Sequence, residues 1–422
     1  MKVRRIIAVC IILALVVHGV LIAQGAQETG ETVLKWPLIW VGADSKAAEV
    51  ARLVGEFNVI NDGKYQVDIE ENPDYDGYRT KLNAQIASKA VPDLFVFAPE
   101  PTMFSFYKGE NLLMDFADEL AGPWGDVFVG GAVAGATVNG ETKSVPYEIA
   151  VTPIWYNKAL FVKAGVTEMP KTMNDFWKAA DKLKAAGIVP TSQMTGGTNA
   201  WTSMLWFSHI AASIGGPSVW EKPITDKVFE EAAAILLRMY SDGNTTKDAV
   251  GGDAGVSGGH FLAGRTAMFI NGPWYIGRVR DEVPEVYANT GVASLPAAGA
   301  YPGGQIGFPL SNLSAGYTDV PAKKQAVLAF MKWMTTPENV KAISMDSGAL
   351  FAVQYKMGPD EVIDPLQAKF VEAVGNATFV ATHFQFNYPS NTVAEFGQAL
   401  AKMALGKATP AEFLQQIAAT VK

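Results

Sequence analysis

The stretch that decides the fold runs from Phe261 to Trp274 and reads FLAGRTAMFINGPW. Within it, Thr266–Ile270 is a short apolar run of the kind that forms a buried β-strand, and a predicted helix through His260 precedes it. The strand ends in Asn271-Gly272-Pro273-Trp274, which places a tryptophan beside a polar side chain at a strand-to-loop junction. A helix through 275–280 is expected next. Such alternation of helix and strand is typical of an α/β protein.

The same alternation extends along the whole chain of 422 residues, a length that favours two or three domains. No low-complexity linker divides the chain, so a second domain must be joined by strands that cross back and forth. The helix predicted at 204–214 is apolar on all sides and is expected to be buried. The other strands are predicted at 34–41, 65–70, 93–98, 151–156 and 292–295, and the other helices at 45–58, 76–90, 172–186, 229–240, 323–334, 361–373 and 392–404.

The N-terminus has the three parts of a secretory signal. Lys2, Arg4 and Arg5 precede an apolar run at 6–22, and Ala23-Gln24-Gly25 then supplies small residues at the spacing that signal peptidase recognises. A transmembrane anchor is the alternative, but it needs about 20 apolar residues in a row. The sequence therefore predicts a signal peptide at 1–25 and an exported, periplasmic protein.

Removal of this leader changes the composition. The single cysteine, Cys10, lies inside the leader, which excludes disulfides, thiolate chemistry and a lipid-bearing cysteine at the cleavage point from the mature protein. The formal charge of the whole chain is -8, and loss of Lys2, Arg4 and Arg5 leaves 31 basic against 42 acidic residues, or about -11. An acidic balance argues against nucleic acid as a partner.

Catalytic and cofactor motifs are missing from the sequence. His209, His260 and His383 do not have the paired spacing of a zinc site, so no metal site is predicted, and no dinucleotide or phosphate-loop fingerprint predicts a cofactor. Two carboxylates, Glu100 and Glu148, could in principle meet in space, as a glycosidase requires. A secreted carbohydrate-active enzyme therefore stays open as an alternative, although the sequence favours a protein that is not an enzyme.

Aromatic and acidic residues stand together at several predicted strand ends. Ligands of open α/β sheets bind beyond the carboxyl ends of the strands, where such junctions converge. Sugars present an apolar ring face that stacks on aromatic side chains, and hydroxyls that bind carboxylates and amides. A polyamine would also suit such a site, through cation–π contacts. The junction residues are Trp40 with Asp44, Phe97 with Glu100, Glu148, Trp201 beside Asn199, and Trp274.

These segments resemble the sugar-binding proteins of ABC importers, the extracellular solute-binding protein family 1 that includes maltose-binding protein. The most specific motif is Phe261–Trp274, which is similar to the family pattern F-x-x-G-x-x-A-M-x-x-x-G-x-W. Further matching pieces, in the family order, are Pro92–Ala98, Val145–Glu148, Trp155–Lys158 and Met169–Thr172. Ser45 departs from the pattern, because maltose-binding protein has a lysine there, and Phe97 replaces a tryptophan.

The resemblance implies an α/β, two-lobed periplasmic-binding-protein fold of type II with a multi-strand hinge. It implies a first lobe of 32–148 plus 297–335 and a second of 149–296 plus 336–422. It also implies a monomer that closes over a carbohydrate and docks on the permease subunits of an ABC transporter. The ligand-binding residues carried over by motif are Asp44, Phe97, Glu100, Glu148, Trp201, Trp274 and, near the C-terminus, Asn391, Glu395 and Phe396.

Overall fold

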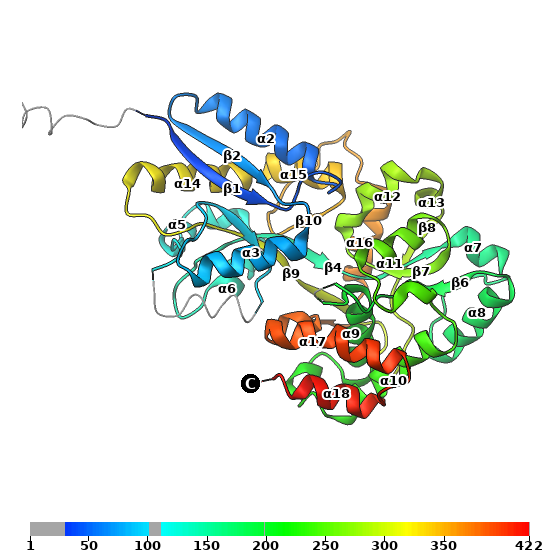
Figure 1. Cartoon of the computed structure of the whole chain (residues 1–422). Coiled ribbons are helices and arrows are strands. Elements are labelled where there is room, and N and C mark those ends of the chain that lie inside the picture. The colour runs from blue at the N-terminus through cyan, green and yellow to red at the C-terminus, as the bar shows by residue number, and fades with distance from the viewer. Residues whose placement is uncertain (1–29, 101–110, 198, 422) are drawn as a thin grey trace, which may run out of the picture.

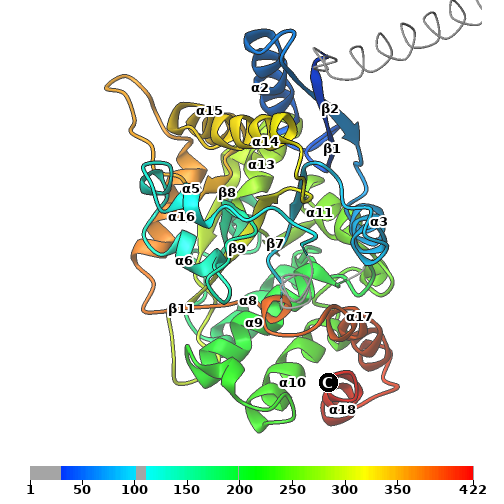
Figure 2. The ribbon, with the colours of Figure 1, turned by 90° about the vertical axis from the view of Figure 1, so that its left-hand side faces the viewer.

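The computed structural model describes residues 30–100, 111–197 and 199–421, which form two α/β lobes joined by crossing strands (Figures 1 and 2). The predicted signal peptide, 1–25, lies outside the described residues. The two-lobed arrangement confirms the predicted fold class.

The first lobe is built on a parallel strand pair, β1 (Thr32–Leu38) and β2 (Tyr65–Glu71), with α2 (Ala47–Ile60) as their crossover. Parallel strands need such a crossover. Helix α2 buries Val50, Leu53, Val54 and Phe57, spaced along one helical face, against the core of this lobe. The other elements of the lobe are α3 (Tyr75–Ala87), β3 (Phe95–Phe97), α5 (Ala117–Leu120), η1 (Gly125–Val127), α6 (Ala132–Ala136), α14 (Pro321–Met334) and α15 (Pro337–Ser347).

The second lobe has a four-stranded sheet and a largely helical core. Its strand order is β6 (Val189–Thr191), β7 (Thr266–Ile270), β5 (Ile154–Asn157) and β8 (Thr290–Ala293). Strand β7 has the bounds that the sequence predicts. The helices are α7 (Lys158–Lys163), α8 (Met173–Ala185), α9 (Trp201–Gly215), η2 (Val219–Glu221), α10 (Lys227–Ser241), η3 (Lys247–Ala249), α11 (Ala254–Leu262), η4 (Pro273–Tyr275), α12 (Ile276–Glu282), α13 (Pro284–Asn289), α16 (Pro365–Gly375), η5 (Phe384–Phe386), α17 (Ser390–Ala404) and α18 (Pro410–Ala418).

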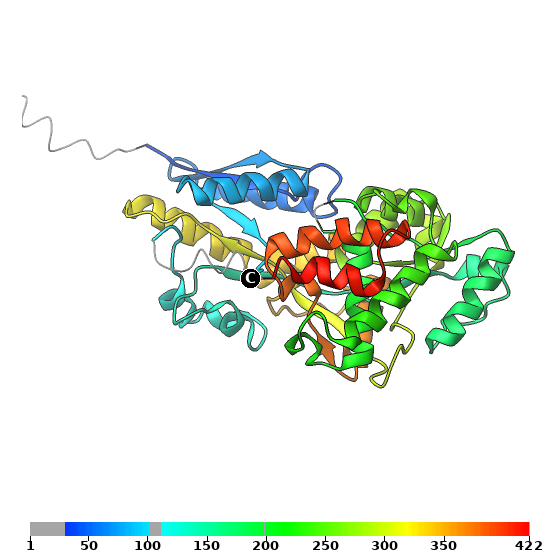
Figure 3. The ribbon, with the colours of Figure 1, turned by 60° about the horizontal axis from the view of Figure 1, so that its bottom comes forward.

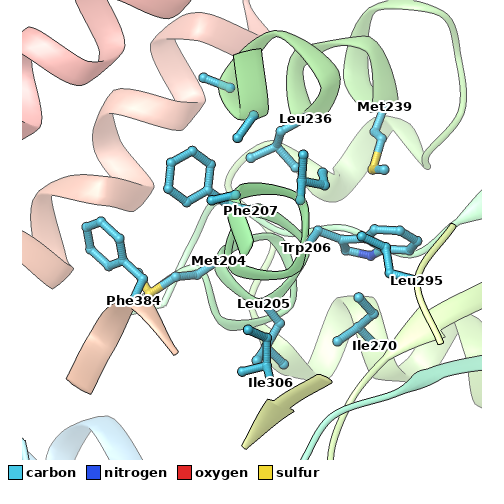
Figure 4. Packing of buried hydrophobic residues seen from close by; sticks show 14 of the residues in the cluster. Met204, Leu205, Trp206, Phe207, Leu236, Met239, Ile270, Leu295, Ile306 and Phe384 are labelled. Carbon is cyan, nitrogen blue, oxygen red and sulfur yellow. The ribbon is translucent and has the colours of Figure 1, made fainter. Parts of the chain in front are cut away.

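Helix α9 lies in the centre of this second core. Met204, Leu205, Trp206 and Phe207 are consecutive and all buried, and they point to different sides of the helix (Figure 4). Their neighbours come from α10, β7 and the C-terminal segment, and α17 and α18 lie side by side on this lobe (Figure 3). The prediction that the 204–214 helix is buried all round is thus confirmed.

The hinge consists mainly of two long antiparallel strands, β4 (Val145–Val151) and β9 (Gln305–Ser314). At one end, Val145 pairs with Leu313 and both belong to the first core, whereas Ala150 and Ile306, near the other end, belong to the second core. Each strand therefore runs from one lobe to the other. The short strands β10 (Leu350–Phe351) and β11 (Val380–Ala381) flank them in the same sheet.

The packing corrects both lobe boundaries implied by the sequence. Residues 336–347 are expected in the second lobe, but α15 packs Val340 and Ile343 into the first core. Residues 297–308 are expected in the first lobe, but Ile306 and Phe308 are buried in the second core. In both cases the chain crosses between lobes later than the sequence suggests, because β9 and β10 are themselves the crossings.

Candidate functional site

A cavity of about 580 Å³ lies between the two lobes, and both lobes line it. Charged side chains lie mostly on the first-lobe side, whereas aromatic rings come from both lobes. The lining includes Asp44, Ser45, Lys46, Tyr75, Arg79, Phe97, Glu100, Glu148 and Ser311 on the first side, and Asn199, Trp201, Asn271, Trp274, Gln385 and Phe386 on the second.

A buried lysine holds two carboxylates together on the first side. Lys46, at the start of α2, is only 2% exposed, and its Nζ lies 3.2 Å from Asp44 Oδ1 and 3.5 Å from Glu148 Oε1. Asp44 Oδ1 also accepts a hydrogen bond of 2.9 Å from the backbone N–H of Lys46, which fixes the turn after β1. Glu148 lies in the hinge strand β4 and is 2% exposed. The three side chains therefore tie the turn before α2 to the hinge.

Burial and charge act in opposite directions within this triad. Burial alone would lower the pKa of Lys46, but the charges of Asp44 and Glu148 outweigh burial and raise it, so the lysine stays protonated. Burial raises the pKa of Glu148; the charge of Lys46 opposes this rise and that of Asp44 adds to it. Ser311 Oγ donates to Glu148 Oε2 at 3.3 Å, whereas Glu148 Oε1 accepts no hydrogen bond from the described part of the chain. That oxygen is itself buried and lies 3.5 Å from the Lys46 ammonium, so its charge is balanced within the triad.

A second carboxylate, Glu100, has both oxygens engaged. Arg79 Nη2 donates to its Oε2 at 2.7 Å, and Gln385 Nε2 donates to its Oε1 at 2.5 Å. Burial raises the pKa of Glu100, while Arg79 and Gln385 oppose that rise. Because Arg79 and Glu100 belong to the first lobe and Gln385 to the second, the last of these bonds crosses between the lobes.

Two tryptophans form the aromatic side of the cavity. The rings of Trp201 and Trp274 lie 5.9 Å apart between centroids, and Trp201 Nε1 donates to Asn271 Oδ1 at 3.3 Å. A Cβ at Gly272 would lie 1.8 Å from the Trp274 ring, so only glycine lets that ring fold back over its own turn. Ala200 precedes Trp201 with φ of 47°, a left-handed conformation that is uncommon for a residue with a Cβ and is found preferentially at functional sites.

Residues 45–341 match the sequence profile of the bacterial extracellular solute-binding proteins. The chain belongs to this family. A maltotriose-binding protein of Pyrococcus abyssi is 25% identical over 359 residues, which cover 81% of this chain and 72% of that protein. A solved chitin oligosaccharide binding protein is 22% identical with a TM-score of 0.83, covering 92% of this chain and 98% of that one. A structure from a study of xylan utilization by Caldanaerobius polysaccharolyticus has a TM-score of 0.83 at 21% identity, covering 92% and 100%.

Six of the nine ligand-binding residues predicted for this solute-binding protein line the one cavity: Asp44, Phe97, Glu100, Glu148, Trp201 and Trp274. Their contact with a ligand stays a prediction. These residues come from turns, from a hinge strand and from the starts of helices, and both lobes contribute to the set.

The three predicted residues near the C-terminus do not line this cavity. Asn391 is exposed, and its Nδ2 donates to the Thr420 carbonyl at 2.9 Å. Glu395 accepts a hydrogen bond from Gln416 on the neighbouring helix. Phe396 is fully buried in the core of the second lobe. Helix α17 faces its neighbour α18 at these positions, while η5, the turn just before it, reaches the cavity through Gln385 and Phe386.

The lining residues of the solute-binding protein that sequence reasoning missed include Lys46, Tyr75, Arg79, Gln385 and Phe386. Lys46 supplies, one residue later, the positive charge that Ser45 lacks. Tyr75 stands exposed at the start of α3 and adds an aromatic ring to the charged side. The pair Tyr75 and Arg79 is spaced by one helical turn, which is a usable signal, whereas no local signal singles out Gln385.

Two absences concern the described ranges only. Across 30–100, 111–197 and 199–421, no His, Cys, Asp and Glu side chains are grouped by three or more so as to hold a metal ion. In the same ranges, no helix is both long and apolar enough to cross a bilayer.

Proposed function

We propose that this solute-binding protein captures a sugar or oligosaccharide between its lobes and delivers it to the permease subunits of an ABC importer. The observation that carries the proposal is the combination of aromatic rings and carboxylates in one cavity. Trp201 and Trp274 offer ring faces, and the carboxylates of Asp44, Glu100 and Glu148 line the same cavity. A sugar needs both, because it stacks through its ring face and binds through its hydroxyls.

The names of the relatives agree with this ligand class. The relative from Pyrococcus abyssi binds maltotriose by its name, and a further solved structure with a TM-score of 0.75 contains raffinose. These proteins are binding proteins, which supports a non-enzymatic role for this chain as well. We further propose that the protein is exported by a cleaved signal peptide, works as a monomer in the periplasm and uses no cofactor or nucleic acid.

A polyamine is the second candidate ligand, because acidic residues outnumber basic ones around the cavity. The acidic lining residues are Asp44, Asp74, Asp76, Glu100, Glu148 and Asp253, and the basic ones are Lys46, Arg79 and Arg278. A thermal-shift screen of neutral mono- and oligosaccharides and of polyamines separates the two ligand classes, because a compound that binds only the folded state raises the melting temperature. Stabilisation by polyamines alone would overturn the sugar proposal.

Calorimetry on the best sugar then tests the site. We expect Trp274→Ala to weaken binding about 30-fold, or about 2 kcal/mol, the scale of a buried aromatic anchor. Tyr301→Ala removes an exposed aromatic ring outside the cavity and should leave the affinity unchanged. Equal affinities of wild type and Trp274→Ala would place the ligand elsewhere. The enzyme alternative is tested by assaying the same sugar for hydrolysis products. Formation of products by wild type, and its loss in Glu148→Gln, would establish that alternative.

A further inference from the structure

Some of the contacts between the lobes are made by residues that line the cavity. Gln385 Nε2, in the second lobe, donates to Glu100 Oε1 of the first lobe at 2.5 Å. Ser45 Oγ, in the first lobe, donates to the Trp274 carbonyl of the second at 2.8 Å. The space between the lobes ends where the lobes touch, so each of these contacts marks an edge of the cavity.

Other bonds between the lobes lie outside the cavity, where α15 meets α12 and α16. Arg280 Nη2, on α12, donates to the Asp346 carbonyl at 2.6 Å. Gln367 Nε2, on α16, donates to Ser344 Oγ at 2.9 Å and to the Ala349 carbonyl at 3.2 Å. These residues do not line the cavity. They join the lobes beside the crossing strand β10 and set no limit on the space for a ligand.

The edge at Gln385 is built from buried polar groups with fixed partners. Arg79 Nη2 donates to Glu100 Oε2 at 2.7 Å, and Asn199 Nδ2 donates to Gln385 Oε1 at 2.7 Å. Glu100 is 1% exposed and Gln385 is 2% exposed. A hydrogen bond to a charged group is about twice as strong as a neutral one. A ligand that displaced Gln385 from Glu100 would therefore lose a strong bond in a buried place.

Aromatic rings stand next to this edge in both lobes. Phe97, in the first lobe, lines the cavity and precedes Glu100 by three residues. Phe386, in the second lobe, lines the cavity directly after Gln385, and its ring is stacked on that of Phe308 with 4.8 Å between centroids. Ring faces that can stack on a sugar thus continue up to the bond between Gln385 and Glu100.

The volume of the cavity limits the length of a ligand over which the lobes can meet in this way. A water molecule takes up about 30 Å³ of the liquid, and a hexose unit displaces roughly six water molecules, or about 180 Å³. The cavity of about 580 Å³ therefore holds about three units. A further unit would have to leave the cavity through one of its edges.

We propose that Gln385 and Glu100 limit the ligand to about three sugar units, because their bond closes the end of the cavity toward which the aromatic rings lead. The inference rests on the proposed function and adds chain length to it. A short ligand lets the bond form as the lobes close over it. A longer chain that passes this edge keeps the bond from forming and leaves Glu100 Oε1 and the Gln385 amide without these partners. Unpaired polar groups of this kind reject the wrong ligand.

Calorimetry on sugars of increasing length tests the proposal. The probes are malto-, xylo- and chito-oligosaccharides of one to six units, which are the sugar types that the relatives' names suggest. The measured quantity is the ratio of the dissociation constants of the six-unit and the three-unit sugar in the series that binds best. A merely structural role of Gln385 would weaken both sugars equally and leave this ratio unchanged.

Two substitutions at Gln385 and one control complete the experiment. Gln385→Ala removes the donor and most of the side chain at the edge of the cavity, and Gln385→Ser does the same with a small polar group. The control is Gln416→Ala, which removes a bond from a glutamine amide to the carboxylate of Glu395 inside the second lobe, away from the cavity. Melting temperatures establish that each variant is folded, and Gln385→Ser gives the answer if Gln385→Ala is not folded.

We expect wild type and Gln416→Ala to bind the six-unit sugar at least 10-fold more weakly than the three-unit sugar, and the Gln385 variants to reduce this ratio to less than 3-fold. The proposal is overturned if wild type binds both sugars equally, or if the Gln385 variants keep the wild-type ratio. Sugar binding without a limit on length would count against this inference alone. If no sugar of any length binds, the proposed function is wrong and the inference falls with it.

Discussion

The most quantitative prediction concerns a pair of buried histidines beneath the cavity. His383 is fully buried against the rings of Trp201, Phe308 and Phe386, and neither of its ring nitrogens has a hydrogen-bond partner among the described residues. Burial lowers its pKa to about 3, and the neighbouring His209 adds to the effect. Burial lowers the pKa of His209 to about 4, although its bond of 2.7 Å to the Thr152 carbonyl opposes this.

The sign of the pH dependence follows from these depressed values. Between about pH 4 and 6.5 the unfolded chain binds a proton at each histidine and the native protein does not, so stability is complete above pH 6.5 and is lost as the pH falls. A pH of 5.0 lies about 1.5 units below the ordinary pKa of a histidine in the unfolded chain. The resulting loss of unfolding free energy is about 2 kcal/mol per histidine. Both native values lie below 5, so this figure depends little on them.

Urea unfolding at pH 7.5 and 5.0 measures the loss. Carboxylates with raised pKa, such as Glu100 and Glu148, act in the opposite direction, so the comparison is made between variants. His383→Phe fits the surrounding rings and should reduce the loss between the two pH values by about 2 kcal/mol. The control Tyr301→Phe leaves the histidines intact and should lose as much stability as wild type. An unchanged loss in His383→Phe would refute the reasoning.

Three further predictions concern the cavity and its surroundings. Gly272→Ala forces the Trp274 ring out of its place and should weaken sugar binding at least 10-fold in calorimetry, whereas Gly259→Ala, where an added methyl meets nothing within 4 Å, should not; equal affinities would count against the stacking role. Phe396→Ala leaves a cavity at a fully buried site and should lower the free energy of unfolding by about 3–5 kcal/mol. The affinity of the folded protein for sugar should not change, and a loss of affinity would show that Phe396 belongs to the binding site. Oligosaccharides that carry a uronic acid should bind at least 10-fold more weakly than their neutral counterparts, because acidic residues dominate the lining, and tight uronate binding would contradict this.

Local pattern predicts the elements whose burial is uniform. Strand β7 is buried throughout and helix α9 is buried from Thr202 to Ser213, so the sequence locates both, and with them Trp201 and Trp274. Strand β9 is not predicted, because Gly307, Pro309 and the polar residues that follow interrupt any alternation. The strand forms nevertheless, because it pairs with β3 and β4, which are far from it in the sequence and outside any local window. The sequence assigns α15 to the wrong lobe for the same reason, because its packing partners are distant in the chain.

Predicting side-chain contacts is harder, because a contact depends on both lobes at once. Lys46 reads as an ordinary exposed lysine after a turn, and its burial depends on the distant Glu148 as well as on Asp44. The C-terminal residues Asn391, Glu395 and Phe396 were placed by resemblance in the part of the chain where the motifs are weakest. A shift of one helix start moves such residues from cavity to core, and here the cavity is reached by η5 instead.

The hinge strands bring ligand recognition and lobe movement to the same residues. The pairing of β4 with β9 shifts register on both sides of Glu148, which is a bulge at the strand that crosses between the lobes. Bulges often lie next to functional sites, where they change the direction of a side chain. This one directs Glu148 toward Lys46 of the first lobe and toward the cavity. A ligand that moves Glu148 would therefore act directly on a strand that carries the hinge, without an intervening network.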